Sequence, residues 1–173
     1  MRTKELKEIH KALFELKNIS LKDSFDLSKI CTKLLSDPKN QHIGRDLTIR
    51  ILDAWEKLPE ETYDLWNSII EAAGLYPYLA QEDLHGSSLI RHEFHKSKHL
   101  DGIYLHEEQM KLSMLLNSSA SIIVSAPTSF GKSLLIEEVV SKRTYKNIVI
   151  IQPTLALLDE TRKKLKNIRI TTE

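Results

Sequence analysis

The first hundred residues alternate apolar stripes at helical spacing with short polar turns. Apolar positions three or four residues apart predict an amphipathic helix over residues 3–17. A second stripe runs from Phe25 to Leu35 and ends before Pro38, and a third runs from Leu47 to Leu58. Pro59 suits the first turn of a fourth helix, and Gly74 suits its C-terminal stop. The pattern therefore predicts a small helical accessory domain over residues 1–83.

The last seventy residues follow a different pattern. Residues 121–125 and 147–152 are short, apolar and rich in β-branched side chains, as expected of buried parallel strands. Residues 132–142 and 155–166 have the periodicity of helices. Strands that alternate with helices predict an α/β domain with a parallel sheet, which binds its ligand at the carboxyl ends of the strands. We expect this domain in residues 103–173, after a linker over residues 84–102.

A candidate phosphate-binding loop connects the first predicted strand to the helix after it. The sequence of residues 126–133 is APTSFGKS, which matches the P-loop pattern when Ala126 takes the first glycine position. Gly131 allows a sharp turn close to the phosphates, and Lys132 would contact the β- and γ-phosphates. The Ser133 hydroxyl would be a ligand of Mg²⁺. An ordinary glycine-containing turn with a surface lysine is the structural alternative.

Four segments resemble the motor domain of superfamily 2 helicases, the DExD/H-box group, in its Ski-like form and in bacterial defence helicases of the Hachiman type. They are the loop itself, the LHEEQ segment that ends at Gln109, the IVIIQPTLALL segment of residues 148–158 and the strand-like residues 168–172. The 23-residue spacing from Gln109 to Lys132 fits that group. Two positions depart from it, since Ser129 replaces a common glycine and Leu155 a common arginine.

The resemblance implies an N-terminal helical domain followed by the beginning of a RecA-like P-loop domain, and an ATP-dependent nucleic-acid helicase or translocase with ATP and Mg²⁺ as cofactors. It implies that Gln109 reads adenine, that Lys132 is catalytic and that Pro153 and Thr154 approach a DNA or RNA strand. The residues expected at the nucleotide are Gln109, Ala126, Pro127, Thr128, Ser129, Phe130, Gly131, Lys132, Ser133 and Leu134, with Ser133 on the metal.

The acidic segment that positions water and Mg²⁺ in this group does not follow the loop. We therefore expect the piece to bind ATP without hydrolysing it efficiently, and we expect it to be the N-terminal part of a longer protein. Two other functions stay open. One is a different P-loop enzyme, such as a small-molecule kinase or a signalling ATPase. The other is a non-catalytic helical interaction protein with a vestigial loop, whose N-terminal domain binds a protein partner.

The linker is basic and contains His92, His95 and His99 at helical spacing. A metal site, a contact with a nucleic-acid backbone and a solvated linker are its three interpretations. Trp55 and Trp66 lie on apolar stripes, which favours core positions over stacking platforms for bases.

Composition narrows the class only in part. The chain is 41% hydrophobic and 28% charged with a formal net charge of +1, so it is not a strongly basic nucleic-acid binder. No apolar run approaches the roughly 20 residues that span a bilayer, and no signal-peptide core is present. Cys31 is the single cysteine, which suits a reducing compartment, and we expect a cytoplasmic protein without membrane contact.

Overall fold

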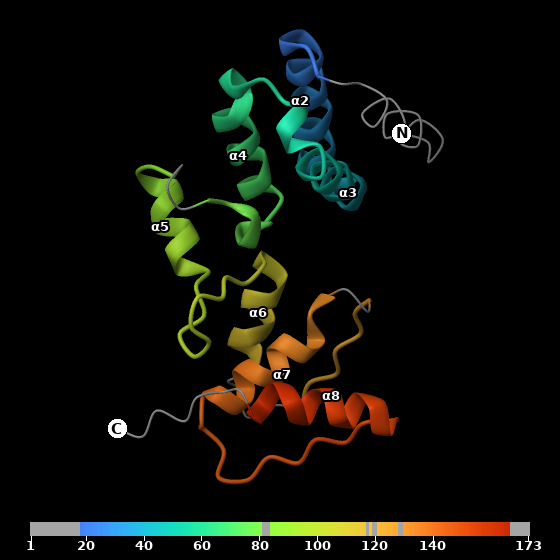
Figure 1. Ribbon diagram of the computed structural model, residues 1–173, viewed down its shortest axis with the longest axis vertical. Coiled ribbons are helices and arrows are strands. Elements are labelled where there is room, and N and C mark those ends of the chain that lie inside the picture. Colours follow the sequence, from blue (N-terminus) through green and yellow to red (C-terminus); the bar gives the residue numbers. More distant parts are fainter. Residues whose placement is uncertain (1–17, 81–83, 117, 119–120, 128–129, 167–173) are drawn as a thin grey trace. The chain divides into compact units, whose positions relative to one another are not determined.

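The computed structural model describes residues 18–80, 84–116, 118, 121–127 and 130–166, and the chain divides into two compact units after His92 (Figure 1). Each unit is described by itself. The helix predicted over residues 3–17, the strand predicted over residues 168–172, Thr128 and Ser129 lie outside the described residues. The predicted domain boundaries at residues 83 and 102 stay predictions.

Unit 1 is built from helices, which Figure 1 shows from blue to light green. Its α-helices are α2 (Leu21–Ser36), α3 (Gln41–Leu52), α4 (Tyr63–Ala72) and α5 (Ser87–Phe94). Three single turns of 3₁₀-helix connect them, namely η1 (Trp55–Lys57), η2 (Glu60–Thr62) and η3 (Tyr76–Tyr78).

The helix ends in unit 1 follow local chemistry. Ser20 caps α2 because its hydroxyl accepts a hydrogen bond from the Asp23 amide at 3.1 Å. The helix then ends at Ser36, before Pro38 as predicted. After α4 the chain turns at Gly74, whose φ of 69° is the left-handed conformation that glycine adopts without strain. The predicted stop at Gly74 is therefore confirmed, whereas the third helix ends at Leu52 rather than Leu58.

The core of unit 1 forms where α2, α3 and α4 meet. Trp66 is completely buried and packs in one cluster with Cys31, Leu47 and Ile51. Trp55 is half-buried and stacks on Tyr63 with 4.9 Å between ring centroids. Burial of a large apolar side chain stabilises a fold by about 1.5–3 kcal/mol. The prediction that Trp66 is a core residue is confirmed.

Helices α2 and α3 pack closely, and Gly44 sets the distance of closest approach (Figure 1). A Cβ atom at Gly44 would lie 2.9 Å from both the backbone nitrogen and the Cγ of Leu35. Only a residue without a side chain fits there, because one of the two nearest atoms belongs to the backbone of the neighbouring helix and cannot move aside as a side chain can.

Unit 2 contains α6 (Glu107–Leu115), α7 (Lys132–Ser141) and α8 (Leu155–Lys166). The predicted helices over residues 132–142 and 155–166 are therefore confirmed. The predicted α/β fold is wrong. Residues 121–125 and 147–152 are irregular, and the described part of unit 2 has no strand beyond one isolated antiparallel bridge between Lys96 and Tyr104. The architecture of the described residues is helical, and they form no RecA-like sheet.

The reason for this difference is physical. β-Branched residues favour extended backbone, but a strand exists only when a neighbouring strand accepts and donates its main-chain hydrogen bonds. Within the described residues neither segment has such a neighbour. Their side chains are consequently exposed rather than buried, with Ile123 at 98%, Val149 at 85% and Ile151 at 89% relative accessibility.

Candidate functional site

The described residues of the predicted phosphate-binding loop, 126–127 and 130–133, lead into α7 through a turn at Gly131. Gly131 adopts φ 82° and ψ 32°, which is left-handed, and it is the residue directly before the helix. Ala126 and Ser133 lie at the two ends of this segment, and the Ser133 side chain is exposed. A helix of ten residues begins here, so its unpaired N–H groups point toward the loop.

Lys132 closes the loop on itself. Its Nζ atom donates hydrogen bonds to the carbonyl oxygens of Ala126 at 2.7 Å and Pro127 at 2.6 Å. Both are bonds from a charged donor, which are stronger than neutral ones. The ammonium group that was predicted to contact phosphate therefore binds the backbone of its own loop.

Gln109, the predicted reader of adenine, is buried and both ends of its amide are used within unit 2. Its Oε1 accepts from the His106 amide at 2.9 Å, and its Nε2 donates to the Phe130 carbonyl at 2.7 Å. A Cβ at Gly131 would lie 2.5 Å from the same Nε2 atom. The structure thus brings Gln109, Phe130 and Gly131 together, and there the amide of Gln109 ties α6 to the loop.

The structure does not bring the remaining predicted site residues into contact with Gln109 or Lys132 through any described hydrogen bond. Leu134 is half-buried on α7, while Pro153 and Thr154 are exposed in the bend before α8. Thr154 accepts a hydrogen bond from the Leu157 amide at 3.3 Å, so it caps that helix. Within the described ranges, no group of three or more His, Cys, Asp or Glu side chains is placed to hold a metal ion.

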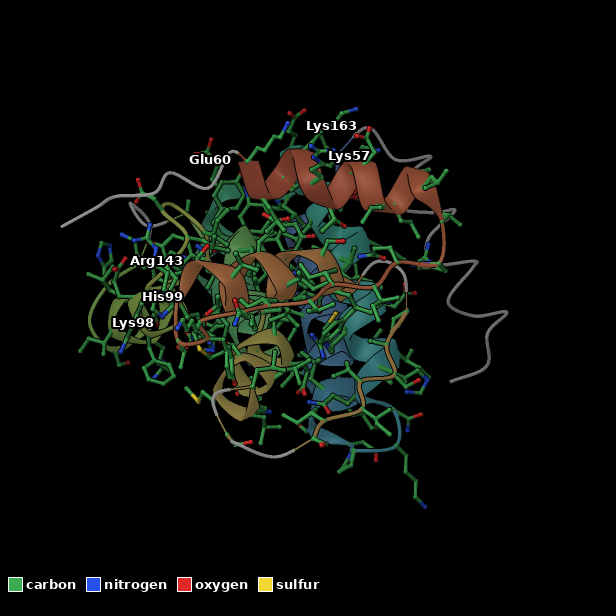
Figure 2. All side chains as sticks on the ribbon, turned by 90° about the horizontal axis from the view of Figure 1, so that it is seen from below. Lys57, Glu60, Lys98, His99, Arg143 and Lys163 are labelled. Carbon is green, nitrogen blue, oxygen red and sulfur yellow. The ribbon has the colours of Figure 1, made fainter. Side chains whose placement is uncertain are left out.

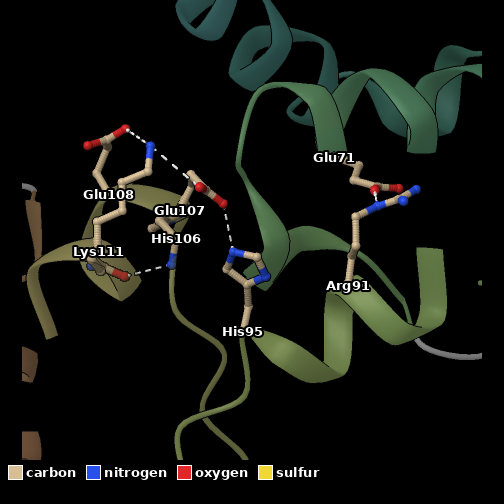
Figure 3. A network of polar contacts seen from close by, with 8 residues as sticks. Glu71, Arg91, His95, His106, Glu107, Glu108 and Lys111 are labelled. Carbon is tan, nitrogen blue, oxygen red and sulfur yellow. Dashed lines mark hydrogen bonds and ion pairs between the residues drawn. The ribbon is translucent and has the colours of Figure 1, made fainter. Parts of the chain in front are cut away.

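The histidine-rich linker is partly built into the folded units. His92 is buried in unit 1, where the neighbouring Arg91 pairs with Glu71 on α4. In unit 2, the Nε2 of His95 lies 2.8 Å from Glu107 Oε2, and Lys111 lies 3.4 Å from the other oxygen of Glu107 (Figure 3). Burial alone would raise the pKa of Glu107, but the hydrogen bond and charge of His95, together with Lys111, bring it below its usual value. Arg91 and His95 therefore form pairs within the folded units, unlike the side chains of a fully solvated linker.

A buried polar network joins α6 and α7, and the sequence analysis missed it. Ser113 donates a hydrogen bond to Glu138 Oε1 at 2.8 Å, and Lys142 donates to the Ser113 hydroxyl at 2.9 Å. Lys142 also lies 3.6 Å from Glu138 Oε1. A sequence signal did exist, since Glu138 is three residues after the buried Leu135 on the same face of the helix.

This network lines a cavity of about 410 Å³ in unit 2. The cavity is bounded by α6, by α7 and by the chain between Glu93 and His99. Lys142 donates a hydrogen bond to the Ser113 hydroxyl, which in turn donates to Glu138, so Lys142 does not accept a hydrogen bond from Ser113 as a general base would. The network therefore has the geometry of a binding or structural site rather than that of a serine nucleophile.

The class defined by these features is a helical protein domain whose predicted loop is closed by its own lysine. The chain belongs to the family described as the Anti-bacteriophage protein B N-terminal domain, which matches residues 1–91. That match ends one residue before the boundary of unit 1.

One curated relative is Anti-bacteriophage protein B of Escherichia coli strain K12, which is 38% identical over 145 residues. The alignment covers 83% of this chain and 20% of the relative, so the chain spans about a fifth of the relative's length. No solved structure matches the chain.

These findings correct the helicase interpretation. The family that matches is an anti-bacteriophage domain, and the described residues lack the sheet on which a RecA-like motor depends. Two of the segments that resembled helicase motifs contain local features that do not depend on a sheet. One is a glycine–lysine–serine turn before a helix, and the other is a proline–threonine bend before a helix. The assignment to superfamily 2 and its DEAD/DEAH-box function is therefore withdrawn, whereas the contact of Pro153 and Thr154 with a nucleic-acid strand stays a prediction.

Of the helices in the described ranges, none has both the length and the apolar character needed to cross a bilayer.

Proposed function

We propose that this chain is a non-catalytic helical interaction module of a protein that defends bacteria against bacteriophage. The defence role is drawn from the family and from the relative in Escherichia coli, whose names state it. The interaction role rests on one structural observation, which is an exposed apolar stretch in unit 2.

The apolar stretch comprises residues 148–158, in the bend before α8 and in its first turns. Val149, Ile151 and Leu155 are 85%, 89% and 84% exposed. Ile148, Leu157 and Leu158 are also exposed. Soluble proteins rarely leave so many large apolar side chains in water within one segment, and such surfaces mark contacts with another polypeptide. Each side chain that a partner covers would contribute about 1.5–3 kcal/mol before the cost of ordering is subtracted.

A phage-plating assay tests this function in bacteria that depend for resistance on the protein carrying this chain. We expect the triple variant V149T/I151T/L155Q to lose protection, because its side chains keep a similar size but no longer favour an apolar partner. The matched control is the pair Asp159→Ala and Lys163→Ala on the exposed face of α8, where Lys163 points outward (Figure 2). Full protection by the triple variant, with protein levels equal, would refute the interaction role.

Binding of ATP and Mg²⁺ at residues 126–133 is a separate prediction. It is supported by the left-handed Gly131 before a ten-residue helix, a geometry that presents N–H groups to an anion. Phosphate would have to release Lys132 from two carbonyl oxygens, and a multiply charged anion is the stronger partner for an ammonium group.

Calorimetric titration with ATP and Mg²⁺ tests this prediction. Lys132→Ala should abolish binding, while the exposed control Lys146→Ala should leave it unchanged. We expect no ATP hydrolysis by the chain itself. Equal affinity of Lys132→Ala and the unsubstituted chain would show that the loop is not a nucleotide site.

We also infer a cytoplasmic location. The support is the single cysteine, Cys31, which is buried as a free thiol in the core of unit 1.

A further inference from the structure

The cavity of unit 2 contains a buried acceptor whose hydrogen-bonding capacity is incomplete. Glu138 is 4% exposed, and its Oε2 atom has no hydrogen-bond partner within the described part of the chain. The other oxygen, Oε1, accepts from Ser113. A buried carboxylate oxygen without a partner is costly, so this position favours a ligand that donates a hydrogen bond.

The walls of the cavity are apolar and adaptable. Met110 and Met114 lie one helical turn apart on α6, and Phe94, which is 61% exposed, also lines the cavity. Thioether groups make favourable contacts with aromatic rings, and an exposed phenylalanine offers a face for stacking. A flat ring therefore suits this space better than a branched aliphatic group.

Basic side chains outnumber acidic ones among the exposed residues that line the cavity, where the one carboxylate, Glu93, accepts a hydrogen bond from the Tyr104 hydroxyl. Lys98 and His99 are consecutive exposed residues at its edge, and neither forms an ion pair within the described residues (Figure 2). Lys96 also lines the cavity, with its ammonium group 5.9 Å from the centre of the Tyr104 ring. An anionic group at the mouth would lie beside the ammonium groups of Lys96 and Lys98 and the imidazole of His99.

The backbone holds this rim in place. The Ser97 amide donates to the Ile103 carbonyl at 2.8 Å, and the Leu105 amide donates to the His95 carbonyl at 2.8 Å. The buried Ser97 hydroxyl accepts from the amides of His99 at 3.2 Å and Leu100 at 3.0 Å. The basic residues thus project from a closed loop, which reduces the ordering cost of binding.

We propose that this cavity binds a nucleotide. The base lies between Phe94 and the two methionines, its exocyclic amino group donates to Glu138 Oε2, and its phosphate lies at Lys98 and His99. The cavity volume of about 410 Å³ is within the range of small-molecule sites. This inference goes beyond the interaction role, and it concerns a site separate from residues 126–133.

Titration calorimetry on the complete chain tests the site with AMP and CMP, whose bases both carry an amino group. Purine riboside 5′-monophosphate lacks that group, and adenosine lacks the phosphate. We expect each of these two compounds to bind about tenfold more weakly than AMP, because each loses one charge-assisted contact. Failure of AMP and CMP to bind at about 1 mM would overturn the proposal and leave water as the partner of Glu138.

Variants locate the site. Glu138→Gln should weaken AMP binding about tenfold, because an amide nitrogen in place of Oε2 cannot accept a hydrogen bond. Lys98→Glu reverses an exposed charge without touching the core and should weaken it similarly, whereas the same change at Lys146, away from the cavity, should not. Lys132→Ala should retain AMP affinity. Loss with Lys132→Ala, or equal affinity of Lys98→Glu and the unsubstituted chain, would refute the location in this cavity.

Discussion

Two hydroxyl groups in sequence satisfy the one polar atom of Trp66, the largest of the fully buried side chains in the described residues. Trp66 Nε1 donates to the Ser24 hydroxyl at 2.9 Å, which donates to the Thr62 hydroxyl at 3.0 Å, which in turn donates to the Pro59 carbonyl at 2.8 Å. This chain of hydrogen bonds joins α2, the turn after Pro59 and α4. The sequence predicted the apolar position of Trp66 from its spacing, but its polar partners are distant in sequence and were not predictable from a local pattern.

The Ser24→Ala variant should be less stable by about 1–3 kcal/mol, because it leaves the buried indole N–H without an acceptor. Urea unfolding followed by circular dichroism measures this difference. Ser36→Ala at the exposed end of the same helix is the control and should change stability by less than about 0.5 kcal/mol. Equal stabilities for the two variants would contradict a structural role for the hydroxyl chain.

The buried thiol of Cys31 makes the stability of unit 1 change with pH in the alkaline range. Burial raises its pKa from 9.0 to about 12, and a hydrogen bond with Thr48 opposes that shift only in part. Above about pH 9 the unfolded chain loses the thiol proton while the folded chain keeps it. Stability is therefore constant with respect to this group below pH 9 and decreases as the pH rises toward 12.

We expect the unfolding free energy to fall more between about pH 8 and about pH 10 in the unsubstituted chain than in Cys31→Ala, in which this group no longer titrates. Chemical denaturation at both pH values gives the comparison. Lysines and tyrosines titrate in both proteins, so the difference between them isolates the thiol. The same fall in both proteins would show that Cys31 does not contribute.

At the scale of elements, helices were predictable and strands were not. The periodicity of α2, α4, α7 and α8 is local, and so are the stops at Ser36 and Gly74. A strand depends on a partner elsewhere, so the apolar runs at residues 121–125 and 147–152 indicated a tendency rather than an element. The candidate site was predictable only to the same extent. The local sequence predicted a turn at Gly131, but it could not predict whether a sheet forms beside that turn, as a motor domain requires.

Helix packing in unit 1 gives a sharp prediction at Gly44. Alanine favours helix by about 1 kcal/mol over glycine, but the added Cβ would overlap the Leu35 backbone and force α2 away from α3. We expect Gly44→Ala to destabilise the chain by about 1–2 kcal/mol in thermal unfolding. His42→Ala, exposed on the same helix, should cause no loss. A more stable Gly44→Ala variant would mean that the helices are farther apart than described.

At the scale of the whole molecule, the division after His92 agrees with the extent of the family, which matches residues 1–91. The two units differ in how completely they bury their apolar residues. Unit 1 encloses large side chains such as Trp66 and Ile70, whereas the described part of unit 2 exposes Ile123, Val149 and Ile151. This contrast suits a folded domain followed by a segment that contacts other polypeptides.

Calorimetry should therefore resolve two unfolding transitions. Ser24→Ala should lower the transition temperature of unit 1 and leave that of unit 2 unchanged, because the hydrogen-bond partners of Ser24, Trp66 and Thr62, both belong to unit 1. Glu138→Gln should have the reverse pattern, since its contacts with Ser113 and Lys142 lie in unit 2. A single transition that shifts equally in both variants would show that the units unfold together.

The two tryptophans of the chain, Trp55 and Trp66, both lie in unit 1. Intrinsic fluorescence emission is consequently a reporter of that unit, with one indole enclosed beside Ser24 and the other stacked on Tyr63. A ligand titration or thermal unfolding experiment that records tryptophan fluorescence would therefore follow unit 1. It would not report changes around α6, α7 and α8 in unit 2. An added probe near Met114 would be needed to make the second unit visible.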